Sequence, residues 1–145
     1  MSGIVCEIPE YNPSSEKIKT ILERYKRVAI VGLSPKPGRD SHKVAKYLKD
    51  NGYRIVPVNP GQKEILGEKC YPNLKAIPFL IDVVDIFRKP EAIPPVVDDA
   101  IAIGAKVVWM QLGLAHNQAA DKARKAGLEV VMDKCIKIEH MNVAK

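Results

Sequence analysis

One segment of the sequence, residues 32–41 (GLSPKPGRDS), carries residue types that bind phosphate. It joins an apolar run to a stretch with helical spacing. Gly32 can let a ligand approach the backbone, and the helix start offers unpaired N–H groups and the positive end of a dipole. Lys36, Arg39 and the Ser34 hydroxyl add charge and hydrogen-bond donors. The segment matches neither GxGxxG nor GxxxxGK[ST]. It therefore predicts a phosphate-binding loop without a dinucleotide fingerprint, with an ordinary strand-to-helix connection as the alternative.

A second candidate segment, Val58-Asn59-Pro60, follows the next apolar run. A NAD-binding protein normally has Asp or Glu about 20 residues beyond its glycines, where it holds the ribose 2′-hydroxyl. Asn59 stands in this region instead, and Lys63 lies close by. The missing carboxylate counts against NAD, and the lysine favours a ligand with phosphate near its ribose. The alternative is a plain turn, because Asn-Pro commonly begins one.

Three later segments end at the same predicted sheet edge. Phe87, Arg88 and Lys89 place an aromatic ring beside two positive charges. Together they can pack a base or ribose and reach a phosphate, or they can form a charged turn. Gln111 supplies an amide after the fourth run. Cys135, near a predicted helix start, is either a thiol available for exchange or a small packed side chain.

The sequence lacks the patterns of a metalloenzyme or a serine hydrolase. Its three histidines form no HxxH or HExxH motif, and there is no GxSxG motif. Cys6, Cys70 and Cys135 are odd in number and far apart, which indicates reduced thiols rather than a disulfide framework or zinc site. Four aspartates are expected on solvated faces or at helix caps: Asp82, Asp85, Asp98 and Asp99. We therefore expect no metal and no catalytic constellation.

Strands and helices that alternate along the chain must position these residues. Five short runs rich in Val and Ile predict strands at residues 27–31, 54–58, 81–87, 106–110 and 129–132. Helices are predicted at 41–51, from Pro94 to Gly104, from an N-cap at Asn117 to Gly127, and at 136–142, with Ser14 or Ser15 capping a leading helix. Strands that alternate with helices in this way predict an α/β fold with an open, doubly wound parallel sheet. In such sheets ligands bind beyond the carboxyl ends of the strands.

Length and charge limit the possible classes of protein. The 145 residues predict a single domain, 1–145, with an N-terminal extension at 1–13. No apolar run approaches the ~20 residues of a membrane-spanning helix, and the start has no secretion signal, so we expect a cytoplasmic protein without a membrane. The net charge of +6 suits nucleic acid or a small polyphosphate ligand. Nucleic acid is not expected, because no recognition motif is present.

Taken together, three segments resemble the family of small stand-alone coenzyme A (CoA)-binding domains: VGLSPKPGRDSHKVAKYLKDNGYRIVPVNP, VVDIFRKPE and VVWMQLGLAHNQAADKARKAGLEVVMDKC. That family is similar to the N-terminal CoA-binding domain of the succinyl-CoA synthetase alpha subunit. The resemblance covers residues 14–142 and keeps the segments in order. It implies a Rossmann-like doubly wound five-stranded parallel sheet that binds CoA in an extended pose, with its phosphates near the first loop.

The resemblance also assigns site residues. In the first loop they are Gly32, Leu33, Ser34, Lys36, Pro37, Arg39 and Ser41, of which Ser34, Lys36, Arg39 and Ser41 would hold phosphate groups. Val58, Asn59 and Pro60 would line the nucleotide side, with Lys63 as a phosphate partner. Ile86, Phe87, Arg88 and Lys89 would flank the ligand, and Gln111 and Leu112 would approach the pantetheine arm. If Cys135 lies near the end of that arm, it could form a mixed disulfide with CoA.

The expected function is therefore binding of CoA or an acyl-CoA, as a carrier, sensor or redox-linked protein, with no protein partner identified. Ligase chemistry is not expected. The synthetase holds its phosphohistidine in a second domain and needs a beta subunit, and a chain that ends at Lys145 has room for neither. The alternative is an NAD(P)-linked or acyl-CoA-transforming enzyme.

Overall fold

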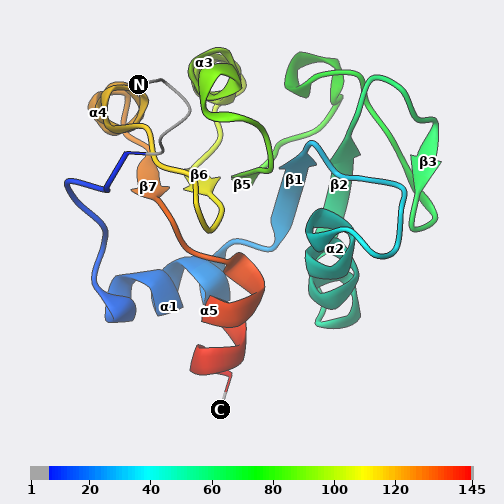
Figure 1. Cartoon of the computed structure of the whole chain (residues 1–145), viewed down its shortest axis with the longest axis horizontal. Helices are drawn as coiled ribbons and strands as arrows, with labels where there is room; N and C mark the ends of the chain where they lie inside the picture. The colour runs from blue at the N-terminus through cyan, green and yellow to red at the C-terminus, as the bar shows by residue number, and fades with distance from the viewer. Residues whose placement is uncertain (1–6, 145) are drawn as a thin grey trace.

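A five-stranded parallel sheet lies between two layers of helices (Figure 1). The computed structural model describes residues 7–144. The sheet strands are β1 (Arg27–Val31), β2 (Arg54–Val58), β5 (Val83–Ile86), β6 (Val107–Met110) and β7 (Glu129–Val131), in the order β2-β1-β5-β6-β7. Nearly every residue of these strands is buried, because helices cover both faces, which is why the strands read as continuous runs of Val and Ile. The predicted doubly wound parallel sheet is confirmed.

The helices divide between the two faces of the sheet (Figure 1). On one face α1 (Ser15–Arg24), α2 (Asp40–Asp50) and α5 (Ile136–Val143) pack around Ile30, Trp109 and Val131. On the other, α3 (Ile93–Ala102) and α4 (Asn117–Lys125) pack around Val84 and Val108. None of the described helices is long and apolar enough to cross a membrane.

The predicted helix starts lie within one residue of the observed ones, but one predicted cap differs. Ser14 caps α1 by accepting from the Lys17 N–H at 3.1 Å, and α3 begins with prolines in its first turn, as predicted. The predicted N-cap at Asn117 is wrong. His116 caps α4 instead, its Nδ1 accepting from the Ala119 N–H at 3.1 Å. The Asn117 side chain is engaged elsewhere, because its Nδ2 donates to the Ile8 carbonyl at 2.9 Å.

The segment between β2 and β5 contains structure that was not predicted. A two-stranded hairpin, β3 (Glu64–Ile65) and β4 (Glu68–Lys69), turns at Leu66 and Gly67, both of which have positive φ. A short 3₁₀ turn, η1 (Leu74–Ala76), follows the hairpin, and a second one, η2 (Pro90–Ala92), comes after β5. Strand β5 (Val83–Ile86) is also shorter than the strand predicted at 81–87.

The described part of the N-terminal extension is hydrogen-bonded to the domain. The Asn12 side chain accepts from the Met132 N–H and donates to the Met132 carbonyl, both at 2.8 Å. Glu7 accepts from the Asn117 N–H at 2.7 Å. Residues 7–12 therefore connect to the end of β7 and to the start of α4.

The order of the strands creates a crevice at one edge of the sheet. From β1 the chain moves outward to β2, and it then returns to β5 on the other side of β1. The connections leaving the carboxyl ends of β1 and β5 therefore diverge, which is the position where open α/β sheets bind ligands.

Candidate functional site

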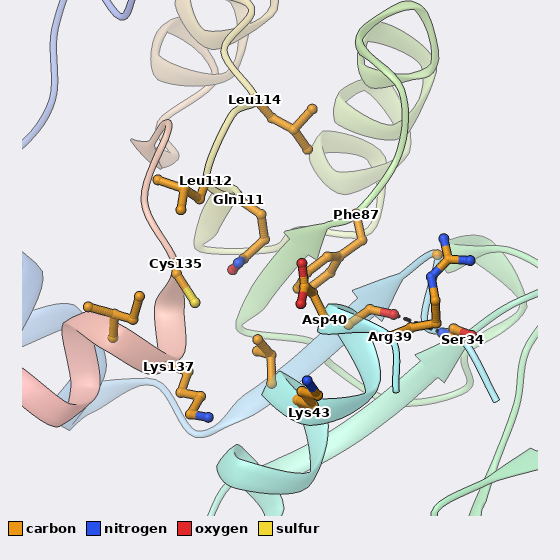
Figure 2. Close-up of a pocket in the computed structure, with 14 residues that line it drawn as sticks. Ser34, Arg39, Asp40, Lys43, Phe87, Gln111, Leu112, Leu114, Cys135 and Lys137 are labelled. Carbon is orange, nitrogen blue, oxygen red and sulfur yellow. Dashed lines mark hydrogen bonds between the residues drawn. The ribbon is translucent and has the colours of Figure 1, made fainter. Parts of the chain in front are cut away.

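A pocket of about 570 Å³ lies at this edge, on the side of α2 and α5 (Figure 2). Its lining residues come from the ends of β1, β5 and β6 and from the starts of α2 and α5: Gly32, Ser34, Arg39, Asp40, Ser41, Lys43, Val44, Phe87, Gln111, Leu112, Leu114, Cys135, Lys137 and Ile138. Segments far apart in the sequence thus form one cavity.

Gly32, directly after β1, lies at a point where only glycine fits. Its φ is +89°, a conformation that other residues rarely adopt. A Cβ at this position would overlap the Phe87 carbonyl oxygen and lie 3.0 Å from Cδ of Arg88. The glycine therefore lets the connections after β1 and β5 lie against each other at the switch point.

The loop after Gly32 is shaped by its own polar side chains. The Ser34 N–H donates to the Ser41 hydroxyl at 3.0 Å, and the Lys36 N–H donates to the Ser34 hydroxyl at 3.1 Å. His42 donates from Nδ1 to the Ser34 carbonyl at 3.0 Å. Asn59 reaches across from the end of β2 and donates to the Leu33 carbonyl at 2.9 Å. These bonds hold the loop over the start of α2.

The start of α2 gives one end of the pocket a cationic character. Arg39 is the N-cap residue, and no described side chain caps the helix. The first N–H groups of a helix have no partner within it, so they are available to an anion. Arg39 and Lys43 line this end with positive charge, beside the carboxylate of Asp40, whereas Lys137 comes from α5 and lies near Cys135 (Figure 2).

The opposite end of the pocket is mostly apolar. Figure 2 shows Ser34 and Arg39 on one side and Cys135 with Leu112 on the other, with Phe87 between them. Leu114 and Ile138 add further aliphatic surface. The pocket therefore changes along its length from a cationic end to a mostly aliphatic end that also carries Lys137.

Gln111 is the buried polar group of the apolar end. Its side chain is only 4% exposed, and its Oε1 accepts from the Ile136 N–H at 3.1 Å. No described residue accepts a hydrogen bond from its Nε2, and the amide points into the pocket beside Cys135 (Figure 2). The pocket wall thus presents one fixed donor among aliphatic side chains.

Asp85 lies in β5, two residues before the pocket residue Phe87. It is fully buried in β5, opposite Ile30 of β1 and Trp109 of β6, and neither of its carboxyl oxygens has a described hydrogen-bond partner. Burial raises the pKa of this carboxyl well above its usual value. The expectation of a solvated or capping role for Asp85 was wrong, because a central strand covered on both faces leaves none of its positions in solvent.

Each histidine has a structural partner. His42 shapes the first loop, His116 caps α4, and His140 Nδ1 lies 2.7 Å from the Tyr47 hydroxyl. Among residues 7–144, no three His, Cys, Asp or Glu side chains are clustered so that they could hold a metal ion.

The residues assigned from the sequence fall into three groups. Eight line the pocket: Gly32, Ser34, Arg39, Ser41, Phe87, Gln111, Leu112 and Cys135. Three have side chains in the hydrophobic core, so they can offer a ligand only backbone: Leu33, Val58 and Ile86. The others lie outside the pocket lining, with Asn59 half-buried and the rest exposed: Lys36, Pro37, Asn59, Pro60, Lys63, Arg88 and Lys89.

Six lining residues were not assigned from the sequence: Asp40, Lys43, Val44, Leu114, Lys137 and Ile138. Most of them come from the first turns of α2 and α5 rather than from the loops that follow strands. Helical spacing could have identified two of them, because Asp40 and Val44 are four residues apart and therefore share a helix face.

Comparisons with known proteins identify the family and the fold of this chain. The family described as CoA binding domain matches residues 26–141. The Bacillus subtilis protein YneT is 46% identical over 129 residues, which cover 89% of this chain and 96% of YneT. The solved structure of a hypothetical protein from Pyrococcus horikoshii OT3 is 45% identical, with a TM-score of 0.90, and the match covers 96% of this chain and 98% of that one.

A more distant relative is much longer. Acetate–CoA ligase [ADP-forming] I of Archaeoglobus fulgidus is 26% identical over 129 residues, which are 82% of this chain but only 19% of the ligase. The likeness to the ligase is thus confined to one small part of that protein. The match over residues 26–141 confirms the resemblance first found in the sequence, and the chain belongs to the CoA binding domain family.

Proposed function

We propose that this protein binds CoA or an acyl-CoA in the pocket at the carboxyl edge of the sheet. In this proposal it acts as a carrier, sensor or redox-linked CoA-binding protein and has no ligase activity of its own. The observation that carries the proposal is the change along the pocket from the cationic start of α2 to an aliphatic wall with one amide donor. CoA has the same division, with a phosphorylated nucleotide at one end and a largely aliphatic arm at the other.

The phosphates are assigned to the α2 end. The uncapped helix start, Arg39 and Lys43 supply N–H donors and charge for a diphosphate. The Ser41 hydroxyl already accepts from the Ser34 N–H, so its own proton is free to be donated to a phosphate oxygen.

Four exposed cations outside the pocket lining are assigned to the remaining phosphate. Lys36, Lys63, Arg88 and Lys89 are exposed, and none forms an ion pair with a described residue. Arg88 also packs beside Gly32, next to the pocket floor. In this proposal Asn59, Pro60 and Lys63, at the end of β2, lie on the nucleotide side, where CoA carries its 3′-phosphate.

The pantetheine arm is assigned to the other end. Leu112, Leu114 and Ile138 can pack against its methylene groups, and Gln111 Nε2 can donate to one of its amide carbonyls. The sulfur then lies near Cys135.

The absence of ligase activity is proposed from the lining of the pocket and from the ligase comparison. No described histidine lines the pocket, so no imidazole stands ready to carry a phosphoryl group there. The longer ADP-forming ligase has most of its chain outside the part that resembles this protein.

Calorimetric titration of the full chain with CoA, 3′-dephospho-CoA and NAD tests the proposal. CoA should bind saturably and most tightly, 3′-dephospho-CoA should bind more weakly because it lacks one phosphate, and NAD should bind weakest. Absence of saturable CoA binding, or a preference for NAD, would overturn the proposal.

A further inference from the structure

We propose that Cys135 is a modification site at which the pocket exchanges disulfides with CoA. In this reaction the cysteine forms a mixed disulfide with the sulfur of the pantetheine arm. The proposal rests on the proposed function, because the pocket must first hold CoA with its arm toward α5.

The thiol is held in a fixed place on the pocket wall. Cys135 is half-buried, lines the pocket and is the N-cap residue of α5. The short segment that carries it is hydrogen-bonded to β6 through Trp109 Nε1, which donates to the Lys134 carbonyl at 2.8 Å. Three bonds join it to the loop after β6: Asp133 N–H to the Leu114 carbonyl at 2.9 Å, Gly113 N–H to Asp133 Oδ1 at 2.7 Å, and Ile136 N–H to Gln111 Oε1 at 3.1 Å. The sulfur is thus presented by a braced segment rather than by a free loop.

Gln111 independently indicates that a ligand lies beside this sulfur. Its side chain is more than nine-tenths buried, its oxygen is used by Ile136, and its Nε2 points into the pocket without a described acceptor. A ligand carbonyl at this point would give Nε2 a hydrogen-bond acceptor in place of solvent. The pantetheine arm carries amide carbonyls, so it can supply the missing acceptor.

The charge distribution sets the direction of the ligand. Arg39, Lys43 and the uncapped helix start are at the α2 end, against Lys137 alone at the α5 end, so the diphosphate is assigned to α2 and the chain of CoA then runs past Phe87 toward Cys135 (Figure 2). The aliphatic surface of Leu112 and Ile138 suits the arm better than it suits a second charged group.

The exchange needs a disulfide of CoA as its co-reactant. The Cys135 thiol loses its proton to water, and its sulfur attacks one sulfur of the symmetrical CoA disulfide. The bond between the two CoA sulfurs breaks as the bond from Cys135 forms. The displaced sulfur leaves with the bonding electron pair as a CoA thiolate, which takes up a proton. One disulfide replaces another, so there is no net oxidation.

Cys70 provides a matched control within the chain. It is only 7% exposed and packs in the core beneath α2, away from the pocket lining. Burial, and secondarily the charge of Glu64, raises the pKa of this thiol, which makes it a poor nucleophile at neutral pH. Cys6 lies outside the described residues and is tested by its own variant.

The experiment treats the reduced full chain with symmetrical CoA disulfide and follows intact mass with time. One CoA adduct per chain is expected in the wild type, Cys6→Ser and Cys70→Ser, and none in Cys135→Ser. Glutathione disulfide at equal concentration should modify Cys135 at least tenfold more slowly, because it lacks the groups that the pocket binds. Acetyl-CoA, whose sulfur is blocked, should slow the adduct by competing for the pocket.

Three results would overturn the proposal: no adduct, equal loss of adduct in all three variants, or glutathione disulfide reacting as fast as CoA disulfide. Calorimetry with CoA on Cys135→Ser and wild type runs in parallel. If CoA binds and the adduct fails, the exchange is wrong and the proposed function stands. If CoA does not bind, the proposed function itself is wrong.

Discussion

The Tyr47 hydroxyl of α2 lies 2.7 Å from Nδ1 of His140 in α5, so one hydrogen bond joins two helices that each contribute residues to the pocket. The same imidazole packs edge-to-face against the rings of Tyr47 and Tyr53. Burial, and secondarily the positive charge of Lys26, lowers the pKa of His140 from its ordinary value of 6.5. The folded protein therefore holds this imidazole neutral at neutral pH.

This lowered pKa predicts a loss of stability in mild acid. The unfolded chain takes up the proton near pH 6.5, whereas the folded chain resists it, so the stabilisation is complete above that pH and falls as the pH drops toward the lowered folded value. Urea unfolding from about pH 7 to about pH 5.5 measures the slope. His140→Gln should flatten it, and equal slopes in both proteins would contradict the prediction.

Gly32→Ala should both destabilise the fold and abolish CoA binding. The positive φ alone costs about 1–2 kcal/mol for a residue with a Cβ, and overlap with the Phe87 carbonyl adds to that cost. Gly38→Ala is the matched control in the same loop, because a Cβ at Gly38 meets no atom within 4 Å. Urea midpoints and CoA titration measure both effects. If the two variants behave alike, the close approach at the switch point is unimportant.

Lys43→Ala should weaken CoA binding about tenfold, in keeping with the loss of one charge-assisted contact to phosphate. Lys46→Ala is the control, since Lys46 lies on the same helix, pairs with Asp50 at 2.8 Å and is outside the pocket lining. The loss should shrink as salt is added, because salt screens exposed charges. Titrations at low and high ionic strength check this, and equal affinities for both variants would remove Lys43 from the site.

Asp85→Val should stabilise the protein at neutral pH by about 1–3 kcal/mol, because it removes an unpartnered polar group from the centre of the sheet. The pKa of Asp85 is raised in the folded state, so the wild type loses stability as the pH rises above about 4, where the unfolded chain already ionises. The gap between variant and wild type should therefore be larger at about pH 7 than at about pH 4. Urea midpoints at the two pH values test this, and a gap that does not depend on pH would count against it.

The parts of the fold that follow from burial could be predicted from the sequence. Runs such as 27–31 and 106–110 are apolar at every position after the first, which indicates strands covered on both faces. The β3–β4 hairpin was missed because its turn, Leu66-Gly67, has a leucine where a positive φ normally calls for Asn or Gly. The cap of α4 was misplaced because His116 caps through a ring nitrogen, whereas Asn117 has the side chain usually found there.

The site could be predicted where it depends on strand ends and not where it depends on helix faces. Ser34, Phe87 and Gln111 each follow a strand, so the topology alone gathers them at one edge. Lys43 and Ile138 reach the pocket from helices, and which face of α5 turns inward depends on tertiary packing.

The paired bonds between Asn12 and Met132 have a consequence for the exposed border of the sheet. β7 is an outer strand, and such strands offer open N–H and C=O groups onto which another polypeptide can add. The Asn12 amide, which carries one donor and one acceptor like a backbone peptide group, occupies both groups of Met132 just past the strand. β7 has only three residues, so the Asn12 side chain leaves few open backbone groups at this edge for pairing with another chain.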